Sequence, residues 1–344
     1  MACETPATQT TTAEEGGAAT ISALHPDIIQ THILTRLDGP ALAAAAASSS
    51  QLYALSSQQH LWTTLCHATW PSTRSPRIRH VISGIFPHAS RSFFSDSFTI
   101  PRPTPTTVTR QIMNLDRTPE LISAVDLHYR HKLILSRVVE TETVSGWFRC
   151  SPFRVDILEP KESVQTPMRY PEDDSACGEM GEDLRLSWIV LDPRGGRAMN
   201  VSSEKAVSVE RHWLSGEVQV KFAAVVGGER GTASELALCS VGVTCVGVEG
   251  GGMEVREGWL EMEDMDGMHL NGRESLGILQ RALEGKRENK KERGRERERW
   301  GEFGKRKRER KERMKRAEGR LDMLCVSLAA LSFAGLFYVC VLCR

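Results

Sequence analysis

The C-terminal end of the chain places the strongest limit on how this sequence can fold. Leu324 to Cys343 is a run of twenty consecutive residues without a charged side chain. At about 1.5 Å per residue, a helix of that length spans a hydrocarbon core of roughly 30 Å. A soluble protein could accept such a helix only by enclosing it on every face, and the preceding residues are too charged to do so. We therefore expect a transmembrane tail anchor in residues 321–344.

The formal net charge of zero hides two regions of opposite charge. Residues 286–320 contain 18 Lys and Arg and 8 Glu, a net charge of +10, so the remainder of the chain carries −10. Because basic flanks stay in the cytosol, this asymmetry predicts a single-pass membrane protein with a cytosolic N-terminus. Lys305-Arg306-Lys307-Arg308 also fits a nuclear-import signal, so a nuclear location is the alternative. We expect no specific nucleic-acid binding, since only Trp300 and Phe303 could stack on bases there.

The charged segment, residues 284–320, has the composition of a solvated helix. Glu and Arg recur four residues apart in it, at the spacing of helical ion pairs. Gly294, Gly301, Gly304 and Gly319 weaken helical order, so we expect an interrupted helix and not a continuous rod. In an anchored chain its basic side chains would lie against anionic headgroups.

Residues 20–70 show helical spacing, after a leader (1–19) whose composition predicts disorder. Pro26 suits a first helical position, and the apolar residues after it recur on one helical face. Asp38-Gly39-Pro40 ends that helix, and an alanine-rich helix follows it. So short a helical region buries too little apolar surface to be stable alone, so we expect a partner to complete its core.

These residues resemble an F-box, the helical module that docks on a Skp-type adaptor and, through it, on the cullin of SCF ubiquitin ligases. Three places depart from the F-box pattern: His25 stands for Leu, Ile28 for an acid, and Ser48, Ser49 and Leu52 for Val-Cys and Trp. The resemblance implies eight adaptor-binding residues, namely Pro26, Ile29, Ile33, Leu34, Leu37, Leu42, Leu61 and Trp62.

The centre of the chain changes from a Pro- and Ser-rich connector (71–120) to a β-rich region (121–283). The prolines of the connector predict that no long element forms there. In the β-rich region apolar and polar residues alternate between turn-forming sequences, which predicts about eight short strands in an antiparallel, sandwich-like domain. The fold class is therefore α+β. The predicted strands are Ala124 to Leu127, Lys132 to Val139, Thr141 to Cys150, Phe153 to Leu158, Leu184 to Leu191, Ala206 to Glu210, Glu217 to Val226, Glu235 to Val248 and Glu254 to Met262.

No pattern for catalysis or metal binding stands out. His128 and His131 lack further ligands at zinc spacing, and the acids from Glu261 to Asp266 lack the closing Glu of an EF-hand. Gly227 to Gly231 lacks the Lys of a phosphate-binding loop. The nine cysteines form no disulfide framework and read as reduced thiols. We expect no active site, cofactor or bound metal.

Tryptophans mark the candidate target-binding positions. Trp188 and Trp213 lie on or beside predicted strands, where core packing and ligand contact are both open. Together with the F-box, the segments around Trp188 and Trp213 resemble those of a plant group that includes the cytokinin-induced F-box proteins. Proteins of that group also end in an apolar tail. The resemblance implies a non-catalytic receptor that brings a target protein to an SCF-type ubiquitin ligase. The alternative is a membrane-anchored, lectin-like β-sandwich binding protein without a ligase role.

Overall fold

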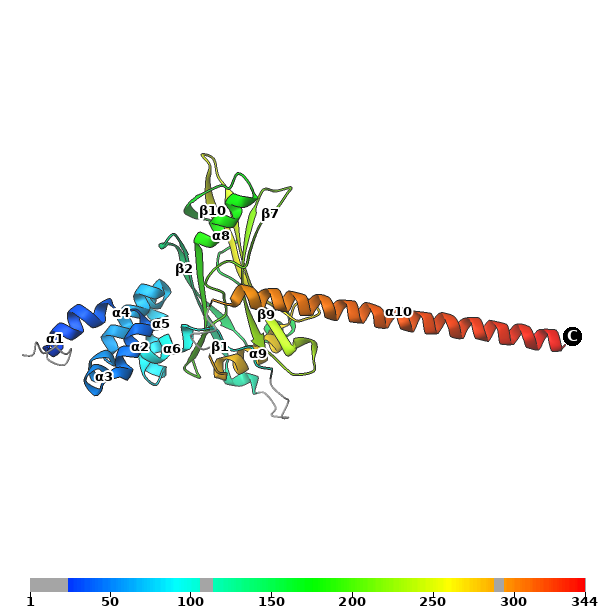
Figure 1. Ribbon diagram of the computed structural model, residues 1–344, viewed down its shortest axis with the longest axis horizontal. Coiled ribbons are helices and arrows are strands. Elements are labelled where there is room, and N and C mark those ends of the chain that lie inside the picture. The colour runs from blue at the N-terminus through cyan, green and yellow to red at the C-terminus, as the bar shows by residue number, and fades with distance from the viewer. Residues whose placement is uncertain (1–23, 106–113, 288–293, 344) are drawn as a thin grey trace, which may run out of the picture. The chain divides into compact units, whose positions relative to one another are not determined.

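The computed structural model describes residues 24–105, 114–287 and 294–343 (Figure 1). The chain divides into two compact units, Met1–Leu65 and Cys66–Arg344, here named the N-terminal unit and the β unit. The fold class is α+β, as the sequence predicts, with N-terminal helices, central antiparallel sheets and a long C-terminal helix. The leader predicted to be disordered lies outside the described residues.

Short helices make up the N-terminal unit. Asp38 accepts a hydrogen bond from the Ala41 N–H (2.8 Å) and Ser49 accepts one from the Leu52 N–H (3.2 Å). These side chains cap two successive helices, which is why the chain turns at both places. The helices are α1 (Pro26–Ile28), the π-helical η2 (Ile29–Ile33), the 3-10 helix η3 (Leu34–Arg36), α2 (Gly39–Ser48), α3 (Ser50–Ser56) and α4 (Gln59–Thr69), which continues into the β unit.

Short helices, the longest of ten residues, make up the described part of the connector; no long element forms there, but the helices themselves were not predicted. Its helices are η4 (Pro71–Arg74), α5 (Pro76–Ile85) and α6 (Ala89–Ser97). Pro71 and Pro76 stand at the start of their helices, where the missing N–H leaves no hydrogen bond unmade. Proline therefore begins these helices where the sequence reading took it to break them.

Two antiparallel sheets form the centre of the β unit. One has the strand order β2-β1-β5-β6, and the other β3-β10-β9-β8-β7 with β4 also paired to β10. Trp188 of the first sheet and Phe222 of the second belong to one buried apolar cluster, so the sheets enclose a sandwich-like core. The strands are β1 (Glu120–Tyr129), β2 (Lys132–Glu142), β3 (Arg154–Asp156), β4 (Val164–Arg169), β5 (Leu184–Asp192), β6 (Arg197–Asn200), β7 (Ser208–Arg211), β8 (Val218–Gly227), β9 (Leu236–Gly247) and β10 (Gly252–Glu263).

One predicted strand is partly wrong. The segment from Thr141 to Cys150 leaves the sheet at the end of β2 and forms the short helix α7 (Gly146–Cys150). Ser145 explains the change, because its side chain accepts the Phe148 N–H (3.1 Å) and caps this helix. The sequence reading also missed β4, β6, the 3-10 helices η5 (Leu115–Arg117) and η6 (Ala233–Glu235), and the helix α8 (Asp174–Asp183).

Helices cover the outer faces of both sheets. Ser72 of η4 donates to the buried Asp126 carboxylate of β1 from its N–H (2.9 Å) and its hydroxyl (2.6 Å). On the other sheet, Ala223 and Val225 point away from the main core and pack with Phe303 of α10 (Glu296–Leu342). A further helix, α9 (Gly272–Glu284), begins with a capping box formed by Asn271 and Glu274. The sandwich is thus covered by helices that the chain supplies before and after its strands.

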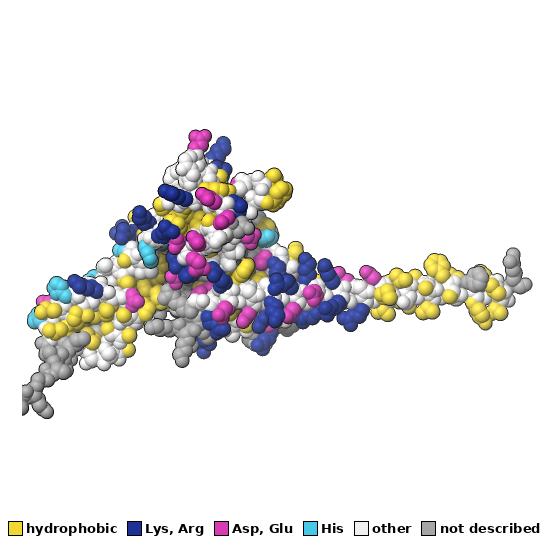
Figure 2. All heavy atoms as spheres, turned by 45° about the horizontal axis from the view of Figure 1, so that its top comes forward, with side chains coloured by type: hydrophobic (Ala, Val, Ile, Leu, Met, Phe, Trp, Pro, Cys, Tyr) yellow, Lys and Arg dark blue, Asp and Glu magenta, His cyan; other side chains and the backbone are white. Residues whose placement is uncertain are grey.

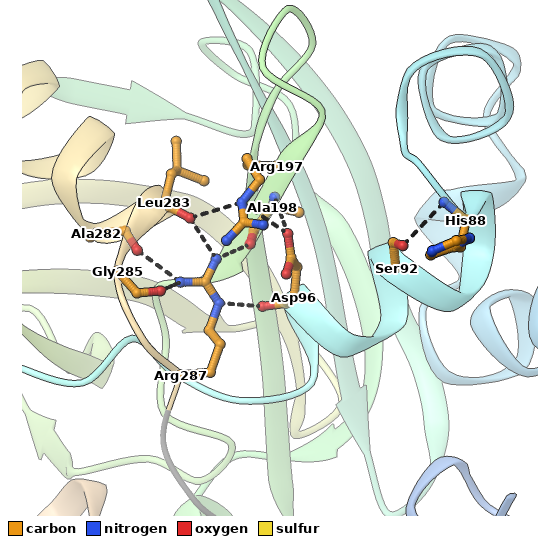
Figure 3. Close-up of polar contacts among 9 residues, drawn as sticks. All are labelled: His88, Ser92, Asp96, Arg197, Ala198, Ala282, Leu283, Gly285 and Arg287. Carbon is orange, nitrogen blue, oxygen red and sulfur yellow. Dashed lines mark hydrogen bonds and ion pairs between the residues drawn. The ribbon is translucent and has the colours of Figure 1, made fainter. Parts of the chain in front are cut away.

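Arg287 ties three of these elements together (Figure 3). Its guanidinium donates to the carbonyl oxygens of Asp96 (3.0 Å) at the end of α6 and of Ala198 (2.7 Å) on β6. It also donates to the carbonyl oxygens of Ala282 (2.8 Å) and Leu283 (3.0 Å) in the last turn of α9. A cation at a helix C-terminus satisfies carbonyls that lack helical partners, and Arg287 does so for two helices.

Helix α10 is continuous from Glu296 to Leu342, so the interruptions predicted at Gly301, Gly304 and Gly319 are wrong, whereas Gly294 lies before the helix begins. Gly301, Gly304 and Gly319 lie inside it, although each glycine costs roughly 1 kcal/mol relative to alanine. Docking on the sheet offsets that cost: Phe303 is 3% exposed, and Arg310 forms a two-bond ion pair with Asp266 (2.5 and 3.2 Å).

Candidate functional site

The predicted adaptor-binding residues divide into two groups by burial. Pro26 is exposed, and Ile33 and Leu37 are half-buried. The other five residues belong to the interior and stabilise the fold of the N-terminal unit itself. They are Ile29 (0% exposed), Leu34 (2%), Leu42 (1%), Leu61 (4%) and Trp62 (3%).

A π-helical turn separates neighbours that an α-helix would place on one face. Residues Ile29–Ile33 form this turn, which holds more residues than an α-helical turn, so spacings of three and four no longer select one side. Leu34 is consequently buried while Ile33 keeps accessible surface. Helical spacing alone could not tell accessible side chains from interior ones in this set.

Exposed apolar side chains that the sequence reading did not select also lie in this unit. Leu24 is 40% exposed, Ile28 47% and Tyr53 53%. Ile28 stands where the F-box pattern usually has an acid. The signal that could have identified Ile28 is its apolar side chain at that position. Like Pro26, Ile33 and Leu37, these residues keep apolar side-chain surface accessible.

Trp188 cannot contact a target directly, because its side chain is 0% exposed. Its indole N–H donates to the Ser123 hydroxyl (3.1 Å) inside the sandwich. Of the two readings left open for this residue, core packing is therefore the one that the structure supports. Trp188 is thus a core residue and not a candidate target-binding residue.

Trp213 has the opposite environment. It lies in the connection between β7 and β8 and is 87% exposed, and the next residue, Leu214, is 74% exposed. His212 and Gly216 close the turn through the Gly216 N–H and the His212 carbonyl oxygen (2.9 Å). The Ser215 N–H donates to Nδ1 of His212 (3.1 Å). The turn is therefore internally bonded while its two apolar side chains stay free to meet a partner.

The buried cysteines are poor nucleophiles. Burial raises the pKa of Cys66, Cys239 and Cys245 to about 12, so each stays a protonated thiol at neutral pH. Across residues 24–105, 114–287 and 294–343, no group of three or more His, Cys, Asp or Glu side chains is arranged to hold a metal ion.

The C-terminal part of α10 carries the candidate membrane segment. Of the helices described, α10 alone is long and apolar enough to cross a membrane. Its first part is lined with Lys and Arg side chains and its last part with apolar ones (Figure 2). The large apolar side chains from Leu321 onward that the structure describes are more than half exposed, Leu331 at 70% and Phe333 at 73% among them. By length and composition, this part of α10 is a candidate membrane span.

Comparison with known proteins gives three relatives in Arabidopsis thaliana. A probable F-box protein is 46% identical over 93% of this chain and 93% of its own length. A second relative, named an F-box protein, is 45% identical over 89% of this chain and 92% of its own. The chain belongs to the F-box protein family. A third F-box protein is 44% identical over 79% of this chain and 76% of its own. No family model and no solved structure matches this F-box protein.

Proposed function

We propose that this F-box protein is a non-catalytic substrate receptor of an SCF-type ubiquitin ligase. The N-terminal unit would bind a Skp-type adaptor and, through it, a cullin, while the β unit holds the target protein. What supports the proposal is that the chain belongs to the F-box family and that its small helical N-terminal unit exposes apolar side chains. Such a unit gains stability by burying those side chains against a partner.

The adaptor contact falls to the accessible members of the predicted set: Pro26, Ile33 and Leu37. The buried members, Leu34 among them, belong to the interior. A substitution at Leu34 would therefore test folding and not binding, and the test belongs at accessible positions.

Co-purification of a Skp-type adaptor with the Ile33→Asp, Leu37→Asp double variant tests this assignment. Two carboxylates in an apolar interface would be desolvated without a partner, so we expect adaptor recovery to be lost. Trp147→Ala is the matched control, since Trp147 is 80% exposed and lies in the β unit. Undiminished adaptor recovery by a folded double variant would overturn the assignment and favour a binding protein without a ligase role.

The C-terminal part of α10 is proposed as a tail anchor. Basic side chains precede the apolar segment within α10, so by the positive-inside tendency both units would lie in the cytosol. The exposed Lys and Arg side chains of α10 would meet anionic headgroups, at roughly 1 kcal/mol for each residue near the surface.

Carbonate extraction of membranes tests the anchor. The full chain should stay in the membrane pellet, whereas a chain ending at Arg320 should be soluble and could enter the nucleus. Leu331→Arg with Phe333→Arg is a sharper variant, because each charge at the centre of a span costs roughly 2.5–3.5 kcal/mol. Release of the full chain by carbonate would contradict the anchor.

A further inference from the structure

Three loops at one end of the sandwich are joined into one surface, which we name the apical loop cluster: residues 170–173, 212–216 and 247–252. Tyr170 joins them. Its N–H donates to the Gly251 carbonyl oxygen (3.0 Å), and its hydroxyl donates to the Gly216 carbonyl oxygen (2.7 Å). Its ring also packs on Gly247, where a Cβ atom would lie 2.9 Å from the ring. One side chain thus fixes all three loops.

Arg211 and Asp173 strengthen this connection. The Arg211 guanidinium donates to the carbonyl oxygens of Pro171 (3.4 Å) and Glu172 (3.2 Å), which ties β7 to the first loop. Asp173 accepts the Ala176 N–H (2.8 Å) and caps α8. The cluster is therefore held in one conformation before any partner arrives, which lowers the entropy lost on binding.

Trp213 and Leu214 are the apolar centre of the cluster. Both are more than 70% exposed, at 87% and 74%. Tryptophan is among the residues that contribute most to binding energy at protein interfaces, because it buries a large rigid surface. A tryptophan and a leucine fixed together at a rigid turn have the features of an interface anchor.

The charge around this centre is negative. In residues 169–173, 210–217 and 247–252 there are five carboxylates and two guanidinium groups, a net charge of −3 with histidine neutral. Arg211 directs its guanidinium toward carbonyl oxygens, as described above. The carboxylates belong to Glu172, Asp173, Glu210, Glu217 and Glu249, and all but Glu217 are exposed.

We propose that the apical loop cluster binds a target segment in which an apolar side chain is flanked by lysine or arginine. This proposal rests on the receptor function proposed above and names the class of target. The apolar side chain would pack on Trp213 and Leu214, and the basic flanks would meet the surrounding carboxylates. Two other occupants fit less well: an anionic lipid surface would be repelled by the net charge of −3, and a second copy would oppose like charges.

Fluorescence anisotropy with three labelled twelve-residue peptides tests the proposal, using the full chain in micelles of a zwitterionic detergent. The first peptide has a central Phe-Leu pair flanked by Lys and Arg. The second has the same pair flanked by Glu and Asp, and the third places Gly-Ser between the Lys and Arg flanks. We expect the first to bind at least tenfold more tightly than the others, with an affinity that falls as salt rises.

Two variants locate the binding and one is the control. Trp213→Ala with Leu214→Ala should weaken the first peptide at least tenfold, and Glu172→Lys with Glu249→Lys should remove its salt dependence. Trp147→Ala should change nothing: Trp147 is 80% exposed on α7, which packs against α9 at the other end of the sandwich (Figure 1).

Equal binding of the three peptides, no binding of any, or full affinity in the Trp213 and Leu214 variant would overturn the proposal. So would dimerisation or vesicle binding that depends on Trp213. Adaptor recovery is scored on the same samples. Its loss without loss of peptide binding would refute the ligase role alone, and the reverse result would refute this proposal alone.

Discussion

Polar bonds in the N-terminal unit are mostly local, whereas many of those in the β unit join distant parts of the chain. Thr31 donates to the Asp27 carbonyl oxygen (2.6 Å) and Ser56 to the Leu52 carbonyl oxygen (2.6 Å), each four residues back. Gln30 is an exception in its unit, since its amide reaches His60 (3.1 Å). In the β unit, by contrast, Thr118 donates to the buried Asp192 carboxylate (2.9 Å), 74 residues along the chain.

The N-terminal unit would therefore gain stability from a partner, whereas the β unit buries a core of its own. Local bonds and five buried members of the adaptor set give the N-terminal unit a small interior, while two facing sheets give the β unit a large one. Long-range bonds close large loops, so they form only when the whole β unit is folded. Binding energy from an adaptor should therefore change the stability of the first unit and not of the second.

The largest expected effect is that of Trp188→Ala on the β unit. Removing a fully buried tryptophan should cost about 3–5 kcal/mol, because it leaves a cavity and an unpaired Ser123 hydroxyl. Hydrogen exchange read by mass spectrometry should show lost protection throughout β1 to β10 and unchanged protection in α2. Equal loss of protection in both units would show that the two units unfold together.

Adaptor binding should produce the next largest effect, in the opposite unit. At an adaptor concentration one hundred times its Kd, linkage predicts a stabilisation of about 2.7 kcal/mol. Exchange protection should rise over Pro26–Arg36 and stay constant over Leu236–Gly247. The Ile33→Asp, Leu37→Asp variant is the control and should show no rise. Increased protection of β9 would show that adaptor binding is transmitted to the β unit.

Arg287→Lys should have a smaller effect, confined to the β unit. Lysine keeps the charge but cannot reach several carbonyl oxygens at once, so we expect a loss of about 1–3 kcal/mol in the free energy of unfolding by urea. Arg316→Lys is the matched control, since its side chain is 74% exposed and pairs only with Glu312 along α10 in the contacts described. An equal effect of both substitutions would show that the junction in Figure 3 adds little stability.

The sequence predicted the strands well because alternation of apolar and polar residues is a direct consequence of a two-faced sheet. The predicted segment from Glu217 to Val226 and the observed β8, Val218–Gly227, agree within one residue at each end. Proline and glycine misled the reading, since their effect depends on position. Pro76 starts a helix, and Gly304 is tolerated because Phe303 beside it is docked on a sheet.

The candidate site was predicted by residue type and not by accessibility. Trp188 and Trp213 look alike in sequence, yet one lies between paired strands and the other in a turn. Ser215 and Gly216 directly follow Trp213 and Leu214 in the sequence. These turn-forming residues are the signal that distinguishes Trp213 from Trp188. The joining of three loops by Tyr170 could not be predicted, because its partners Gly216 and Gly251 lie far along the chain.

The smallest expected effect is a change in the pH dependence of β-unit stability in Asp126→Asn. Burial raises the pKa of the Asp126 carboxyl, and hydrogen bonds from Ser72 and Ser136 oppose this only in part. The folded state therefore holds this proton more tightly than the unfolded state does. The contribution of Asp126 to the free energy of unfolding should fall as pH rises from the usual aspartate value, 3.8, through the raised folded value.

Asparagine cannot titrate, so the variant should lack this contribution. It can still accept from the Ser72 N–H and the Ser136 hydroxyl through Oδ1, while its amide donates to the Ser72 hydroxyl, so the net cost of the exchange should stay near 1 kcal/mol or less. Urea unfolding of both proteins between about pH 4 and pH 7 gives the measurement. The variant should gain stability relative to the natural chain as pH rises, because the natural chain alone must keep a buried carboxylate ionised. A difference that stays constant across this range would show that Asp126 binds its proton equally in the folded and unfolded chains.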